Sequence, residues 1–149
     1  MARFLVVSDD ADERRRAANA VTLIEGAVVE TAATADELRN ALLQPDHSFD
    51  VAIVDGDLHP RGGYAALYDI RARCELEGRA AIPTVILGSR ETDAWLSRWA
   101  GASAFICKPV DAFTLSATAE RIIGTQPPPY GDAGAASAQV AAATRDHQE

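Results

Sequence analysis

The feature that most constrains the fold is a buried strand that ends in acidic residues, within the segment FDVAIVDGDLHPRGG at positions 49–63. Its apolar residues 51–54 are followed at once by Asp55 and Asp57. An apolar, β-branched run of this length, bounded by Asp, Gly and Pro, is typical of a strand covered on both faces. A carboxylate at the end of such a strand lies at the rim of a parallel sheet, where open α/β proteins bind their ligands. Asp55 is therefore predicted to be the chemical centre.

Apolar runs alternate with segments of helical periodicity along the chain. The predicted strands are 3–8, 27–33, 51–54, 81–87 and 102–107, and the predicted helices are 12–24, 35–43, 63–78, 91–100 and 111–123. Thr34, with Glu37 three residues on, is predicted to form a capping box. Strands alternating with helices of this length imply a parallel sheet with right-handed crossovers and helices on both faces. We expect a doubly wound (βα)5 α/β fold, a flavodoxin-like three-layer sandwich with strand order 2-1-3-4-5.

Length and composition indicate one domain followed by a different kind of segment. The 149 residues are 48% hydrophobic and 24% charged, enough for a core without disulfide or metal support. From residue 125 the chain contains three consecutive prolines, then glycines, then an alanine-rich end. We predict a domain at 1–124 and a linker or tail at 125–149 that forms at most a weak helix.

Charge, cysteine content and hydropathy argue against several classes of function. A net charge of −8 disfavours a nucleic-acid-binding surface, which needs a basic face. No apolar run approaches the ~20 residues of a membrane span, and the N-terminus lacks the apolar core of a signal peptide. Cys74 and Cys107 fit no metal spacing and indicate a reducing compartment. We expect a cytoplasmic protein without nucleic-acid or membrane partners.

Residues that carry chemistry follow the predicted carboxyl ends of four strands. They are Asp9 and Asp10, Asp55, the pair at 88–89, and Lys108. Strands 1, 3, 4 and 5 are contiguous in the expected sheet, with the topological switch point between strands 1 and 3. Clustered carboxylates bind a hard cation such as Mg2+, and a lysine supplies positive charge to a phosphoryl oxygen. This combination indicates phosphoryl transfer to an aspartate.

The segments FLVVSDD, DVAIVDGDLHPRGG, IPTVILGS and AGASAFICKP resemble the receiver domains (response-regulator, chemotaxis-type) of two-component signalling. The resemblance covers residues from about 3 to 124. It implies that Asp55 accepts a phosphoryl group from a histidine kinase or a phosphotransfer protein of a phosphorelay. Leu58 and Gly63 follow at the family spacing. Lys108 would contact the phosphoryl group, and its peptide bond to Pro109 is usually cis in the family.

The resemblance also implies a Mg2+ site, with a departure from the family pattern. An ungapped alignment places Ser8 at the first of two acidic positions and Asp9 at the second, so one carboxylate is lost. The expected ligands of a weakly bound Mg2+ are then Asp9, Asp55 and the backbone carbonyl of Asp57. A register shifted by one residue would instead make Asp9 and Asp10 the acidic pair, with Asp10 as a further ligand.

The positions that respond to phosphorylation in the family are altered as well. Gly88 falls where a Thr or Ser hydroxyl is usual, and Ser89 falls where the family has a small residue. Phe105 stands at the position of the common switch tyrosine and lacks its hydroxyl. His59 occupies the usual site of a proline, which here is Pro60, one place later.

The expected output is through protein contacts rather than catalysis of an external reaction. The resemblance implies a downstream protein partner or a fused domain, contacted through the fourth helix, fifth strand and fifth helix, a face that would also serve a homodimer. Trp95 and Trp99 lie one helical turn apart in the fourth helix. We expect Trp95 to pack in the core and Trp99 to face outward as a partner contact.

Two other functions remain open at this point. One is a degenerate receiver that binds a protein or small ligand without phosphorylation. The other is a phosphatase, because VDGDL also resembles the DxD motif of haloacid-dehalogenase-type enzymes, in which Asp57 would be the acid. That family usually has DxD on its first strand and a cap insertion, and this sequence has neither. A flavin mononucleotide site is weaker still, since the SDDADE turn would repel a phosphate.

Overall fold

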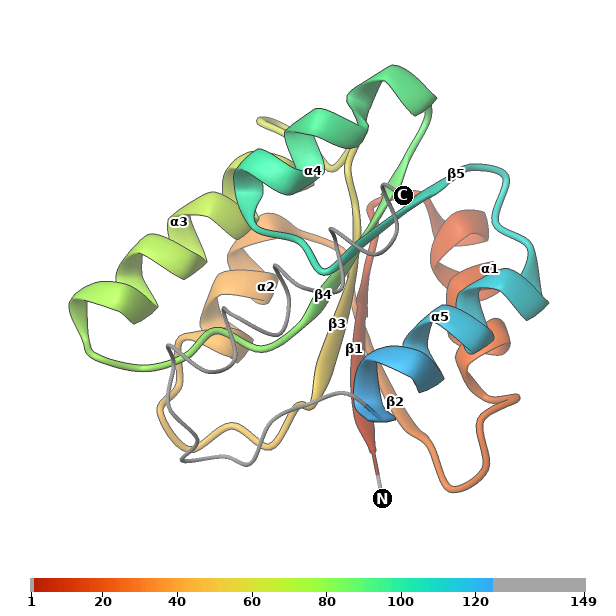
Figure 1. Cartoon of the computed structure of the whole chain (residues 1–149), viewed down its shortest axis with the longest axis horizontal. Helices are drawn as coiled ribbons and strands as arrows, with labels where there is room; N and C mark the ends of the chain where they lie inside the picture. The colour runs from red at the N-terminus through yellow and green to blue at the C-terminus, as the bar shows by residue number, and fades with distance from the viewer. Residues whose placement is uncertain (1, 125–149) are drawn as a thin grey trace, which may run out of the picture.

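The alternating pattern of the sequence is present in the computed structural model, which describes residues 2–124 (Figure 1). The strands are β1 Arg3–Val7, β2 Val28–Ala32, β3 Val51–Asp55, β4 Thr84–Gly88 and β5 Ala104–Cys107. The helices are α1 Ala11–Val21, α2 Ala35–Leu42, α3 Gly63–Leu76, the 3-10 turn η1 Glu91–Asp93, α4 Ala94–Ala100 and α5 Ala112–Gly124. The predicted linker or tail at 125–149 lies outside the described residues.

The five strands form one parallel sheet in the order β2-β1-β3-β4-β5, which confirms the predicted flavodoxin-like fold. Side chains alternate across the sheet, as the two-residue period of a strand requires. Val51 and Ile53 pack with α1 and α5, whereas Ala52 and Val54 pack with α2, α3 and α4. Figure 1 shows these two helical layers on opposite sides of the sheet. Every residue of β3 is buried, and each fully buried Val or Ile contributes about 1.5–3 kcal/mol.

Local capping agrees in part with the sequence pattern. The Thr34 hydroxyl oxygen accepts a hydrogen bond from the Glu37 N–H at 3.1 Å, as predicted for the N-cap of α2. The Glu37 carboxylate accepts from the Thr34 hydroxyl, also at 3.1 Å, in place of the backbone bond of a full capping box. At the far end of α4, Gly101 adopts a left-handed conformation with φ of 86° and closes the helix.

The prediction that Trp95 packs in the core is wrong. The buried residues of α4 are Ser97 and Ala100, so small side chains occupy its inner face. Trp95 is 58% exposed, and Trp99 is 54% exposed with its ring stacked on Tyr68 at a centroid distance of 4.5 Å. A seven-residue helix has room for only one face against the sheet, and its small residues take that face. Within residues 2–124 no helix has the length and apolar character needed to cross a bilayer.

Candidate functional site

Asp55 is the last residue of β3 and its carboxylate is almost completely buried, with 2% of the residue exposed. Lys108, which follows β5, places Nζ 2.8 Å from Asp55 Oδ1. Ser8, which follows β1, donates its hydroxyl to Asp55 Oδ2 at 2.7 Å. The Asp57 N–H donates to Oδ1 at 2.9 Å. The loops after β1, β3 and β5 thus deliver donors to one buried carboxylate, and such charge-assisted bonds are the strong ones.

Lys108 joins the two acids of the β3 loop. Its Nζ lies 2.8 Å from Asp57 Oδ2 as well as from Asp55 Oδ1. Burial lowers the pKa of Lys108, but hydrogen bonds to Asp55 and Asp57 outweigh burial, and the net pKa is raised. The Lys108 N–H donates to the Gly88 carbonyl at 2.7 Å, and the bond to Pro109 is cis. The ammonium group is therefore charged at neutral pH and held against both carboxylates.

Asp9 takes part in a different interaction. Its Oδ2 accepts from the His59 N–H at 2.9 Å and lies 2.7 Å from His59 Nδ1. The backbone hydrogen bond from His59 is the largest cause of a lowered Asp9 pKa. The pair links the loop after β1 to the loop after β3, where the bond from His59 to Pro60 is cis. Asp9 is therefore bonded to the neighbouring loop and not to Asp55.

Asp10 caps the first helix. Its Oδ1 accepts from the N–H groups of Asp12 and Glu13 at 2.9 and 3.1 Å. An acceptor here satisfies helix N–H groups that have no partner within α1. The pairing of β1 with β3 is continuous up to Val7 opposite Val54, so Ser8 comes next to Asp55. Ser8 is therefore the residue of this loop that bonds to Asp55, as the ungapped alignment requires, and the alignment itself stays a prediction.

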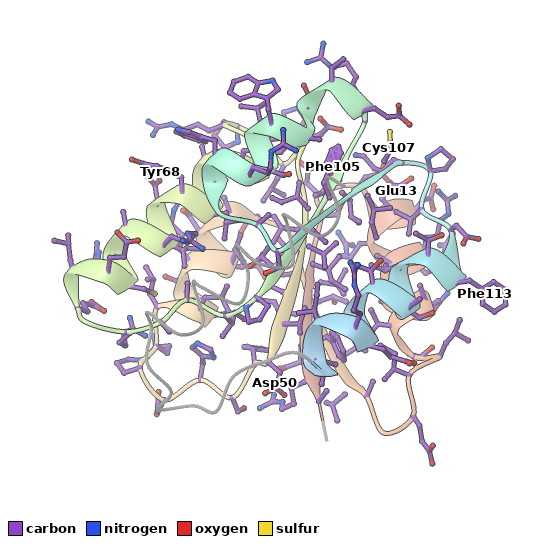
Figure 2. The ribbon with its side chains drawn as sticks, viewed as in Figure 1. Glu13, Asp50, Tyr68, Phe105, Cys107 and Phe113 are labelled. Atoms are coloured by element: carbon purple, nitrogen blue, oxygen red, sulfur yellow. The ribbon has the colours of Figure 1, made fainter. Side chains whose placement is uncertain are left out.

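The end of β4 is crowded although Gly88 has no side chain. A Cβ at Gly88 would lie 2.6 Å from Phe105 Cζ and 2.7 Å from the Tyr64 hydroxyl oxygen. Phe105 is on β5, beside Cys107 (Figure 2). Ser89 is exposed and donates to Asp57 Oδ1 at 3.4 Å. Ser89 thus reaches the outer acid of the loop, and its hydroxyl is not bonded to Asp55.

Tyr64 was not singled out from the sequence. Its ring lies where side chains at Gly56 and Gly88 would be. The signal that could have revealed Tyr64 is a glycine at the end of each of two neighbouring strands, Gly56 and Gly88. A missing Cβ is useful where another group approaches the backbone closely.

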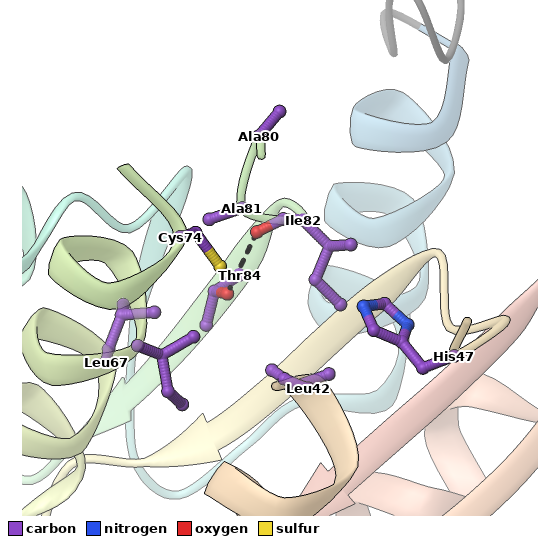
Figure 3. A pocket seen from close by; sticks show the side chains of 9 residues that line it. Leu42, His47, Leu67, Cys74, Ala80, Ala81, Ile82 and Thr84 are labelled. Atoms are coloured by element: carbon purple, nitrogen blue, oxygen red, sulfur yellow. Dashed lines mark hydrogen bonds between the residues drawn. The ribbon is translucent and has the colours of Figure 1, made fainter. Parts of the chain in front are cut away.

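A cavity at the opposite edge of the sheet is too small to compete as a site (Figure 3). It is lined mainly by apolar side chains, and its volume of about 10 Å³ is no more than one water requires. Thr84 donates its hydroxyl to the Ile82 carbonyl at 3.3 Å, and burial lowers the pKa of His47 beside it. This cavity therefore does not compete with the carboxyl edge around Asp55 as a ligand site.

Solved structures with this arrangement are response-regulator receiver domains. A CheY-like receiver protein from Methanospirillum hungatei JF-1 matches with a TM-score of 0.68 and 24% identity, over 83% of this chain and 94% of that one. The chemotaxis regulator CheY4 of Vibrio cholerae matches with a TM-score of 0.69 and 24% identity, over 82% of this chain and 98% of that one. The chain has the receiver fold. NtrX from Brucella abortus, solved in complex with ADP, matches with a TM-score of 0.67 and 29% identity, over 84% of this chain and 28% of that one. No sequence-family model matches, and no curated protein matches by sequence.

The side chains of this receiver fold do not form the predicted Mg2+ site as they are arranged. Asp9 is bonded to His59, and the Lys108 ammonium lies between Asp55 and Asp57. Nowhere in residues 2–124 are three acidic, His or Cys side chains grouped to hold a metal ion. The expected ligands are oxygen atoms of the kind that Mg2+ prefers, but in this arrangement the cation next to the Asp55 carboxylate is Lys108, so the Mg2+ site remains a prediction.

Proposed function

We propose that the chain is a receiver of two-component signalling in which Asp55 accepts a phosphoryl group. The observation that carries this proposal is the buried Asp55 carboxylate, held at 2.8 Å by Lys108 at the carboxyl edge of a receiver fold. A carboxylate can act as a nucleophile where its charge is oriented by fixed donors. A signalling module of this kind performs chemistry on itself and needs no external substrate pocket.

The proposed step follows from the donors around Asp55. One carboxylate oxygen attacks the phosphorus of a phosphohistidine or a small acyl phosphate. The new P–O bond forms as the bond from phosphorus to the donor breaks, and its electron pair leaves with the donor. The Lys108 ammonium is placed to donate to the incoming phosphoryl oxygens and to offset their charge. The Ser8 hydroxyl holds the other carboxylate oxygen in place.

The proposed partners are a histidine kinase or phosphotransfer protein and a downstream protein or fused domain. The α4–β5–α5 side of the molecule carries exposed aromatic side chains that suit a protein contact. Trp95, Trp99 and Phe113 are 58%, 54% and 78% exposed. Aromatic residues are enriched at protein interfaces, which supports this face as the output surface or as the surface of a homodimer.

A second candidate is a receiver fold that binds a partner without phosphorylation. It is favoured by the pairing of Asp9 with His59 and by the absence of a hydroxyl at Gly88. A phosphatase of the DxD type has less support. Its acid, Asp57, is paired with Lys108, and Asp55 ends the third strand of the chain rather than the first.

The test is to incubate the protein with acetyl phosphate and Mg2+ and to measure its intact mass. We expect the wild type to gain one phosphoryl group that hydroxylamine removes, and Asp55→Asn to gain none. Asp69→Asn is the matched control, because this acid lies on α3 with its side chain 53% exposed. A wild type that stays unmodified would favour binding without phosphorylation. Release of phosphate from an ester that stops in Asp57→Asn would favour the phosphatase.

A further inference from the structure

The space beyond the end of β4 holds a hydroxyl group that comes from another element. Gly88 closes β4 without a side chain, and the hydroxyl oxygen of Tyr64 lies 2.7 Å from the position that a Cβ there would take. A threonine at this position would carry its hydroxyl on that Cβ. The Tyr64 oxygen thus lies close to the position of the side chain that Gly88 lacks.

The same oxygen lies close to the end of β3. A Cβ at Gly56, the residue after Asp55, would be 2.8 Å from the Tyr64 hydroxyl oxygen and 2.7 Å from its ring. Gly56 is joined to β4 through its N–H, which donates to the Leu87 carbonyl at 2.7 Å. The Tyr64 hydroxyl therefore lies close both to Gly56, which follows β3, and to Gly88, which ends β4.

This hydroxyl is buried and has no hydrogen-bond partner among the described residues. Buried Tyr hydroxyls usually have a partner, and an unpaired one in a folded protein calls for a functional or structural reason. Burial, followed by the negative charges of Asp93 and Asp57, raises the pKa of Tyr64 to about 12. The group is thus protonated at neutral pH and has a hydrogen to donate.

We propose that Tyr64 donates a hydrogen bond to the phosphoryl group on Asp55, in the place of the strand β4 hydroxyl that Gly88 lacks. This role rests on the proposed phosphorylation of Asp55. A phosphoryl group carries several strong acceptor oxygens, and it would be added beside a donor that is otherwise unpaired. The Phe105 ring borders the same point, since a Cβ at Gly88 would lie 2.6 Å from its Cζ.

The experiment compares Tyr64→Phe with the wild type, using beryllofluoride in the presence of Mg2+ as a mimic of the phosphoryl group. Fluorine NMR detects the bound mimic and its hydrogen-bond donors directly. We expect Tyr64→Phe to bind beryllofluoride about tenfold more weakly or worse, the range for loss of a hydrogen bond to a charged group, and to shift the bound fluorine signals. Tyr68→Phe is the matched control, since Tyr68 is on the same helix, one turn on, and 46% exposed.

The outcomes separate the inference from the function on which it rests. Equal affinity and equal fluorine signals in Tyr64→Phe and the wild type would overturn the role of Tyr64 and leave Asp55 as the acceptor. A wild type that neither binds beryllofluoride nor gains a phosphoryl group from acetyl phosphate would overturn the proposed function itself. Tyr64→Phe keeps the ring that fills the space beside Gly56 and Gly88. We therefore expect its thermal unfolding midpoint to equal or exceed that of the wild type.

Discussion

The two sides of the candidate site depart from the receiver pattern in opposite ways. On the β1 side Ser8 stands in for a carboxylate, and the remaining acid, Asp9, is bonded to His59. On the β4 side Gly88 stands in for a hydroxyl residue, and the Tyr64 hydroxyl lies in the space left open. The first side loses a charge with no replacement, whereas the second loses a hydroxyl and receives one from α3.

The difference indicates which part of the chemistry the pocket retains. With Ser8 neutral, the buried charges next to the core are one carboxylate and one ammonium group, Asp55 and Lys108. Lys108 offsets the charge of Asp55 and is also paired with Asp57. The β4 side has the Lys108 ammonium and the Tyr64 hydroxyl, which has no hydrogen-bond partner within residues 2–124, and such donors suit a phosphoryl oxygen. We therefore expect the groups that contact a phosphoryl group on Asp55 to lie on the β4–β5 side.

The largest expected effect comes from removing the positive charge on that side. Lys108→Met should lower the free energy of unfolding by about 2–3 kcal/mol, because it leaves Asp55 buried without its cation. The expected loss is smaller than the roughly 3–5 kcal/mol that follows when one partner of a fully buried ion pair is removed, because the Lys108 side chain is partly exposed. Urea unfolding at neutral pH measures the loss, and Lys108→Arg, which keeps the charge, should lose less.

The pH dependence of this loss has a defined sign. The pKa of Lys108 is raised in the folded state, so its contribution is complete below the ordinary value of 10.5 and is lost as the pH rises through the folded value. The difference between wild type and Lys108→Met should therefore be constant near neutral pH and shrink at alkaline pH. A difference that grows above pH 10.5 would contradict the assignment.

A smaller effect is expected from restoring a side chain at the end of β4. Gly88→Thr should destabilise by about 1–2 kcal/mol, because its Cβ would come too close to Phe105 and to Tyr64. A double-mutant cycle with Phe105→Ala sharpens the test. In that background Gly88→Thr should cost less, since one of the two groups in contact is gone. Equal costs in both backgrounds would show that the space beside Gly88 is not shared with Phe105.

The smallest effect concerns the β1 side. Ser8→Asp should place a second carboxylate beside Asp55 and raise the affinity for Mg2+ by about tenfold, or 1.4 kcal/mol. Calorimetric titration with Mg2+ measures this change, and Ser8→Asn serves as the uncharged control. If Ser8→Asp binds Mg2+ no more tightly than the wild type, the carboxylate missing at position 8 is not what limits Mg2+ binding on the β1 side.

The layers of the fold could be predicted from the alternation of strands and helices, and the pairing of Asp55 with Lys108 could be predicted from where their strands end. A buried strand that stops at an acid and another that stops at Lys-Pro must meet at one edge of a parallel sheet. Asp55 and Lys108 do meet there. Thr34 was found as a cap for the same kind of reason, since capping depends on local spacing.

The features that the sequence did not predict depend on contacts between loops or between helix and strand. The hydrogen bonds from His59 to Asp9 join residues 50 positions apart, which no local pattern encodes. Trp95 was placed in the core from its spacing with Trp99, but the size of Ser97 and its neighbours decided which face of α4 packs. Tyr64 was missed because its position depends on the absence of side chains on two other strands.

The most direct test of the central claim is to locate the phosphoryl group on the chain after incubation with acetyl phosphate and Mg2+. Borohydride reduction converts an aspartyl phosphate to a marked residue that peptide mass spectrometry can place. We expect the mark on Asp55, with none on Asp57 or Asp9. An unmarked chain, a mark on another acid, or a borohydride-resistant phosphate on Ser8 would contradict it.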